Sequence, residues 1–257
     1  MPEPGTPEEF YVGYRPQAPP GLARFVRLAV AGVLGLSALV ALLLVFAQRP
    51  FSAASFEFGV RRTFEGWVLE RPEPLLVVPR PGRSTGAAGA SRYLLVAFGK
   101  HSAAGQVEGL DGRWVRLEGS LIYRDGLTMI ELAEGSIERL EGRQARPPGA
   151  GEDLGGFTLV GEIVDSKCYL GVMKPGSLKP HRACATRCLS GGVPAVFVVR
   201  HGQGEASHLL LTDADGGSVN SRVLDRVAEP LRIRGRVERF GELLVLRADP
   251  ETYERLG

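Results

Sequence analysis

Two short stretches decide the fold, VRLEGSL at residues 115–121 and LRIRGRV at residues 231–237. In each stretch apolar and polar residues alternate on both sides of a central glycine, Gly119 or Gly235. Alternation of this kind is typical of a half-buried β-strand, and a glycine inside a strand marks a sharp bend. A second glycine follows a few residues later in each case and predicts a hairpin turn.

These stretches lie near the ends of two longer segments that resemble each other, which indicates a duplicated module. The starts of the segments also match loosely, FEGWV at 64–68 against LVGEI at 159–163. A glycine in mid-strand lets the strand coil at a barrel corner, and closure of a barrel removes exposed edges. We therefore predict a mainly β protein with two small OB-like β-barrels in tandem. A β-sandwich is the alternative.

The chain divides into five parts on this interpretation. The 34 glycines and 18 prolines favour short strands joined by turns, and they concentrate where linkers are expected. The predicted parts are a disordered cytoplasmic tail (1–23), a transmembrane helix (24–48), a first OB-like module (55–141), a Gly/Pro-rich linker (142–156) and a second OB-like module (157–257).

The apolar run from Leu28 to Phe46 contains no charged residue. It approaches the roughly 20 residues that a helix needs to cross a bilayer core. A cleaved signal peptide is the alternative, since small residues at 52–54 resemble a cleavage site. The run is longer than a signal core of about 7–15 residues, and a long tail precedes it, so a retained anchor is favoured.

The orientation of this span depends on the arginines that flank it. They are nearly balanced: Arg15, Arg24 and Arg27 before the span, and Arg49, Arg61 and Arg62 after it. The closer clustering at the N-terminal end favours a cytoplasmic N-terminus. We expect a single-pass protein of the bacterial inner membrane, with its folded modules in the periplasm.

Nucleic-acid binding and several kinds of catalysis are not supported. The net charge of +2 is small, and the chain has few of the aromatic residues on which bases stack. The sequence shows no Ser-His-Asp order, phosphate-binding loop or paired carboxylates. An accessory protein is therefore expected rather than an enzyme, and no nucleic-acid partner.

All three cysteines fall between Gly161 and Pro194. Pro180 is placed to open a short helix, and two glycines at 191–192 to close it. Within that helix the spacing i, i+3 and i+7 puts three side chains on one face. Those three are His181, Cys184 and Cys188, and Cys168 follows the preceding strand closely enough to fold over them.

The candidate metal ligands are Cys168, His181, Cys184 and Cys188. Three thiolates and an imidazole suit zinc or copper, with Met173 as a further soft ligand for Cu(I). Asp165 is placed to accept a hydrogen bond from His181. Basic residues in this segment would favour thiolates; they are Lys167, Lys179, Arg182 and Arg187.

Other interpretations of the cluster remain open. Cys184 and Cys188 could form a disulfide or exchange with Cys168, as is common in an oxidising compartment. Haem is less favoured, since the Cys-x-x-Cys-His attachment motif is absent. Cysteines can also pack simply as small apolar side chains.

The segment DSKCYLGVMKPG at 165–176 is followed by HRACA at 181–185, by Cys188 and by GGVP at 191–194. This pattern resembles one found in uncharacterised bacterial membrane-associated proteins, which have no established activity. The resemblance implies that the cluster is the working site of such proteins. It covers part of the second module and none of the first.

Together these features predict a membrane-anchored accessory protein. Its C-terminal module would bind a metal or redox cofactor, and its partner would be a membrane or periplasmic redox complex. A thiol–disulfide redox protein is one alternative. A structural subunit of a membrane complex, with a stabilising disulfide, is the other.

Overall fold

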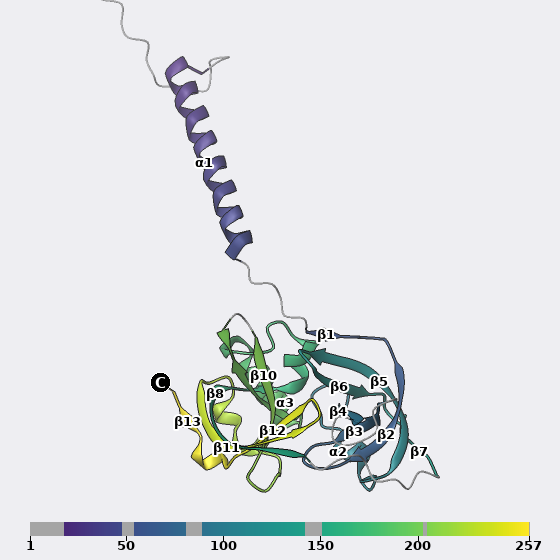
Figure 1. Ribbon diagram of the computed structural model, residues 1–257. Coiled ribbons are helices and arrows are strands. Elements are labelled where there is room, and N and C mark those ends of the chain that lie inside the picture. Colours follow the sequence, from purple (N-terminus) through teal and green to yellow (C-terminus); the bar gives the residue numbers. More distant parts are fainter. Residues whose placement is uncertain (1–17, 48–53, 81–88, 142–150, 203–204, 257) are drawn as a thin grey trace, which may run out of the picture. The chain divides into compact units, whose positions relative to one another are not determined.

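The structure is a computed structural model that describes residues 18–47, 54–80, 89–141, 151–202 and 205–256 (Figure 1). The chain forms two compact units. One falls within residues 1–51, and the other within residues 52–257.

The first unit contains the helix α1 (Pro20–Ala47). It is 28 residues long and contains an 18-residue stretch with a mean hydropathy of 2.7, so it is long and apolar enough to cross a membrane. A signal sequence near the N-terminus would have the same properties. The helix begins earlier than the expected boundary at residue 24, because Pro20 fits the first turn, where its missing N–H is not needed. Residues 1–17 of the predicted tail lie outside the described residues.

Five strands close the first barrel of the second unit. They are β2 (Arg62–Leu69), β3 (Leu75–Pro79), β4 (Ala90–Val96), β5 (Trp114–Arg124) and β6 (Leu127–Leu132). They pair in the order β5-β2-β3-β4-β6, and β6 returns to β5. Smaller elements accompany them: β1 (Ser55–Phe56), α2 (Ala104–Val107) and β7 (Glu138–Arg139).

The second barrel repeats this arrangement. Its strands are β8 (Glu152–Asp165), β9 (Ala195–Arg200), β10 (Ala206–Thr212), β11 (Leu231–Phe240) and β12 (Leu243–Arg247). They pair in the order β11-β8-β9-β10-β12, and β12 returns to β11. The third and fifth strands are parallel in both barrels, β4 with β6 and β10 with β12. The prediction of two tandem OB-like barrels is confirmed.

The two stretches that predicted the fold lie in equivalent strands, β5 and β11. Gly119 is the residue at which β5 leaves β2 and begins to pair with β6, which closes the barrel. A Cβ atom there would collide with Ile130 and with the carbonyl of Glu131. The strand can therefore cross β6 only because this position is a glycine.

Short helical turns and one terminal strand complete the second barrel. After β10 come η5 (Asn220–Arg222) and η6 (Leu224–Arg226), and after β12 come η7 (Pro250–Thr252) and β13 (Glu254–Arg255). Each barrel has an interior of its own, and a third apolar cluster joins the two barrels. Leu94 and Met129 of the first barrel lie in that cluster with Val196, Leu210 and Val245 of the second.

The second module begins earlier than the expected residue 157. Its first strand starts at Glu152, inside the predicted linker, because this Gly-containing stretch pairs with β11, for example Gly156 with Arg236. Residues 142–150 of the predicted linker lie outside the described residues.

Candidate metal centre

Every cysteine lies in the loop between β8 and β9, residues 166–194. The loop contains the π-helical turn η2 (Cys168–Val172), the 3-10 turn η3 (Lys179–His181) and the helix α3 (Arg182–Ser190). In OB folds, the loop between the first two strands is one of the loops that commonly bind ligands. The fold thus presents the cysteines at a position suited to binding.

The helix α3 forms close to where the sequence predicts it. Pro180 lies in the turn that precedes it, and Gly191 caps its C-terminal end. Gly192 has a φ of +85°, in the left-handed region that glycine favours after a helix. Cys184 and Cys188 are one helical turn apart and share a face of α3.

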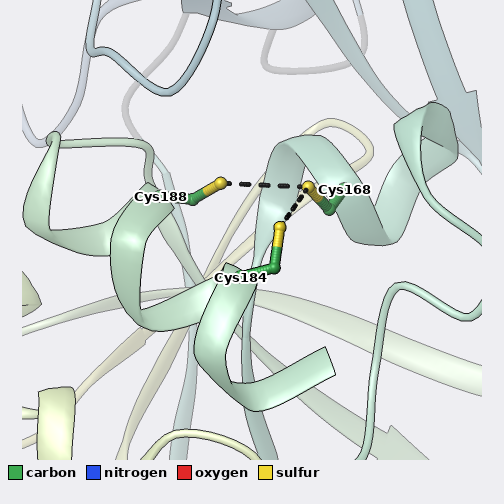
Figure 2. Close-up of side chains that lie close together, drawn as sticks. All are labelled: Cys168, Cys184 and Cys188. Carbon is green, nitrogen blue, oxygen red and sulfur yellow. Dashed lines mark hydrogen bonds between the residues drawn. The ribbon is translucent and has the colours of Figure 1, made fainter. Parts of the chain in front are cut away.

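Figure 2 shows the three cysteine side chains turned toward one another, Cys168 from η2 and the other two from α3. The Sγ atom of Cys168 lies 3.9 Å from that of Cys184 and 3.8 Å from that of Cys188. All three sulfur atoms lie within 4.8 Å of one another. The cysteines are free thiols in this arrangement.

These separations suit one metal ion held by three thiolates. A tetrahedral zinc ion binds sulfur at about 2.3 Å, which places neighbouring sulfur atoms about 3.8 Å apart. The distances of 3.8 and 3.9 Å from Cys168 match that spacing. The three cysteines could therefore hold a metal ion.

His181, the fourth predicted ligand, faces a different neighbour. Its Nε2 atom lies 3.1 Å from the Oδ2 atom of Asp165, as the sequence predicted. The other carboxylate oxygen of Asp165 accepts the backbone N–H of Cys168 at 2.8 Å. Asp165, Cys168 and His181 form a second group that could hold a metal ion, and this group shares Cys168 with the first. The structure thus places the four predicted ligands in two overlapping groups.

The sequence did not indicate Lys100, which comes from the first barrel. Its Nζ atom lies 2.8 Å from the Sγ atom of Cys184 and 3.6 Å from that of Cys188. Lys100 belongs to the tight loop that follows β4, and the backbone of this loop touches Gly191 at the end of α3. The site is therefore built from both barrels.

Lys167 holds that loop in place. Its buried ammonium group donates to the backbone carbonyls of Ala97 at 2.8 Å and Gly99 at 2.7 Å. It also forms an ion pair with Glu131 on β6. Lys167 was expected to favour thiolates directly. Instead its side chain points into the first barrel and positions Lys100.

In the described part of the chain, the other basic residues of the segment make no hydrogen bond to sulfur. Arg182 pairs with Glu229 and donates to the carbonyl of Asp225, because α3 turns it away from the cysteines. Met173, the additional ligand considered for copper, is 46% exposed. Among the described residues, Lys100 is the cation that contacts the sulfur atoms.

The hydrogen bond between the thiols of Cys168 and Cys188 shifts their pKa values in opposite directions. It raises the pKa of Cys168, and burial adds to this effect. It lowers the pKa of Cys188. A hydrogen bond to Cys184 also raises the pKa of Lys100, so this residue stays an ammonium. Cys188 is the thiol of the pair that ionises first, beside a positive charge.

Burial leaves one side of the cluster accessible. Cys168 and Cys188 are 3% and 1% exposed, whereas Cys184 is half-buried. Asp165 and His181 are buried as well. An ion or a small thiol reagent would therefore reach the sulfur atoms past Cys184 and Lys100.

Comparisons with known proteins add little to this description. No protein-family model and no curated protein matches the chain. Among solved structures, a deletion mutant of the single-stranded DNA-binding protein from Thermus aquaticus is similar at 16% identity, over 77% of this chain and 95% of that one. Its TM-score is 0.21, too low to support any inference about this protein.

Proposed function

We propose that this protein is a membrane-anchored accessory protein that binds one metal ion through Cys168, Cys184 and Cys188. The observation that carries the proposal is the spacing of the three sulfur atoms at 3.8 and 3.9 Å around Cys168. Thiolates at this separation are the ligands expected of a zinc or Cu(I) site.

The charge of the site favours zinc. Three thiolates with Zn²⁺ leave one negative charge, which the ammonium of Lys100 would neutralise; with Cu(I) a negative charge would remain. The hydrogen bond from Lys100 to Cys184 would remain in the metal-bound site. It would orient the Cys184 thiolate, as groups that hydrogen-bond to metal-binding side chains commonly do. His181 would act either as a fourth ligand or, through Asp165, as a support for Cys168.

The membrane and periplasmic parts of the proposal rest on α1. A retained helix would tether the two barrels to the inner membrane, and the flanking arginines favour a periplasmic location for them. The proposed partner is a membrane or periplasmic redox complex, with the cysteine loop at the contact. A periplasmic location would separate the barrels from DNA and RNA, so nucleic-acid binding is not part of the proposal.

Thiol–disulfide exchange is the second candidate, and the contact between the thiols of Cys168 and Cys188 favours it. The pKa of Cys188 is lowered and Cys168 lies beside it. A thiolate of the cluster would attack a disulfide of a partner, and a second thiol would then resolve the mixed disulfide, which leaves the partner reduced and a disulfide in this chain. The two candidates differ in one respect. Exchange requires an oxidised form, whereas metal binding requires all three thiols reduced.

The test is a metal titration of the full chain, purified in detergent, reduced and kept anaerobic. Zn²⁺ is added in competition with a chromophoric chelator, and Cu(I) in a parallel series. The proposal predicts one equivalent bound by the wild type and none by Cys168→Ser, with unchanged folding by circular dichroism. Equal zinc binding by both proteins would refute it. A disulfide in protein taken directly from membranes would favour the exchange function.

A further inference from the structure

Among the contacts between the two barrels is one made by a pair of equivalent loops, each of which reaches the opposite barrel. In the first barrel β4 leads into a tight loop closed by a bridge between Val96 and Ser102. In the second barrel β10 leads into a loop closed by a bridge between Thr212 and Ser218. Because β4 and β10 hold the same place in their barrels, the two loops are counterparts.

Each of these loops contacts the opposite barrel at the loop between its first two strands. Ser102 donates its backbone N–H to the carbonyl of Gly191, beside the cysteines. Ser218 forms a hydrogen bond with the carboxyl group of Glu73, in the loop between β2 and β3. The β2–β3 loop of the first barrel is therefore the structural counterpart of the cysteine loop in the second. Glu73 lies in this counterpart loop.

A cavity of about 700 Å³ lies at this counterpart position. The β2–β3 loop of the first barrel lines one part of it. The loop at 213–218 and the β11–β12 hairpin of the second barrel line another. The volume falls in the range of about 300–1,000 Å³ that is typical of sites for small molecules.

Glu73 carries an unsatisfied polar atom in this cavity. It is 5% exposed, and its Oε1 atom has no hydrogen-bond partner in the described part of the chain. Burial raises the pKa of the carboxyl group to about 7, against the opposing effect of the bond from Ser218. Since a buried acceptor without a donor is costly, this oxygen is the atom to which an N–H or O–H of a ligand would bind.

The remaining walls are mixed: apolar side chains and guanidinium groups lie beside the carboxylates of Glu70, Asp213 and Asp215, and Arg247 is paired with Glu238. Arg92 and Arg247 line the cavity with Phe240 and Leu243. The Cζ atom of Arg92 lies 5.8 Å from the centre of the Phe240 ring, so a cation and an apolar surface are adjacent. Guanidinium groups bind carboxylates well, because their paired donors match both oxygens.

We propose that this inter-barrel cavity binds a small organic acid that also carries an amine or hydroxyl group. The donor of the ligand would bind Glu73, its carboxylate would lie near Arg92 or Arg247, and its apolar part would contact Phe240 and Leu243. This site is separate from the cysteine centre and does not depend on a metal ion.

The test uses three probes that differ by one group each: L-leucine, 4-methylpentanoate, which lacks the amine, and 3-methylbutylamine, which lacks the carboxylate. Each is titrated calorimetrically into the full chain in detergent. The proposal predicts saturable binding of leucine, weakened about tenfold or more when either group is removed, which is the usual effect of losing a hydrogen bond to a charged group.

Variants locate the binding on the molecule. Glu73→Gln should weaken leucine binding about tenfold, and Glu108→Gln, on an exposed residue outside the cavity, should leave it unchanged. Cys184→Ser should bind leucine as the wild type does, which separates this test from that of the metal centre. Absence of leucine binding, or binding that Glu73→Gln does not weaken, would overturn the proposal.

Discussion

The ammonium nitrogen of Lys100, in the first barrel, lies 2.8 Å from the sulfur of Cys184, in the second. The two residues are 84 positions apart in the chain. This contact shows that the first barrel, which has no cysteine, contributes directly to the cysteine centre. The duplicated module therefore serves the site and is more than a spacer.

Removal of the Lys100 charge should weaken metal binding. Lys100→Met takes away the hydrogen bond to Cys184 and the charge that balances three thiolates. We expect zinc affinity to fall about 10–100-fold, which is typical when a group that hydrogen-bonds to a metal-binding side chain is removed. Competition with a chromophoric chelator measures the change. Lys179→Met, at an exposed position of the loop between β8 and β9, is the control and should bind zinc normally. An equal loss in both variants would contradict the role of Lys100.

Loss of Lys167 should destabilise the folded unit. Lys167→Met leaves the carbonyls of Ala97 and Gly99 and the carboxylate of Glu131 without their buried partner. Removing one member of a buried ion pair costs about 3–5 kcal/mol. Urea unfolding of the full chain in detergent, followed by tryptophan fluorescence, measures the free energy. The exposed Lys174→Met is the matched control. A change below about 1 kcal/mol for Lys167→Met would show that the contact adds little, as for a surface pair.

His181 should support the metal centre through Asp165. Because its ring faces Asp165, we expect His181→Ala to lower zinc affinity about 10–100-fold while one equivalent still binds. Cys184→Ser should instead abolish stoichiometric binding. Titrations of both variants at matched protein concentration decide between these roles. Complete loss of binding in His181→Ala would make this histidine a ligand, as the sequence predicted.

Glu73 should make stability depend on pH. Burial raises the pKa of this carboxyl group from its ordinary 4.5 to about 7, so the folded state holds a proton that the unfolded state releases. Stability contributed by this group should fall as pH rises from about 4.5 to about 7, by about 3 kcal/mol in total. Glu73→Gln should remove this slope and be more stable than the wild type above pH 7. Parallel pH profiles for the two proteins would contradict the assignment.

The sequence predicted the features that depend on local pattern. Alternation around Gly119 and Gly235 is a property of each strand. The repeat of this pattern indicated that the two barrels have the same fold. The helix carrying Cys184 and Cys188 followed from its proline and glycine boundaries, and the bond between His181 and Asp165 from their order along the chain.

The features that the sequence did not predict depend on contact between the barrels. Lys100 and Glu73 reach their positions only when loops of one barrel meet loops of the other, and no periodicity encodes such a contact. Lys167 was predicted to lie near the thiols and favour thiolates, because it directly precedes Cys168 in the sequence. Its side chain points the other way, since consecutive residues leaving a strand turn to different sides.

The central claim, that the three cysteines hold one metal ion, is tested most directly by the metal content of the full chain. The protein is isolated anaerobically from membranes and analysed by elemental mass spectrometry. The account predicts one zinc or copper ion per chain in the wild type, and less than about a tenth of that in the Cys168→Ser, Cys184→Ser and Cys188→Ser variants, because each loses a thiolate ligand. A wild-type protein that carries no metal, and takes up neither zinc nor Cu(I) when reduced, would contradict it.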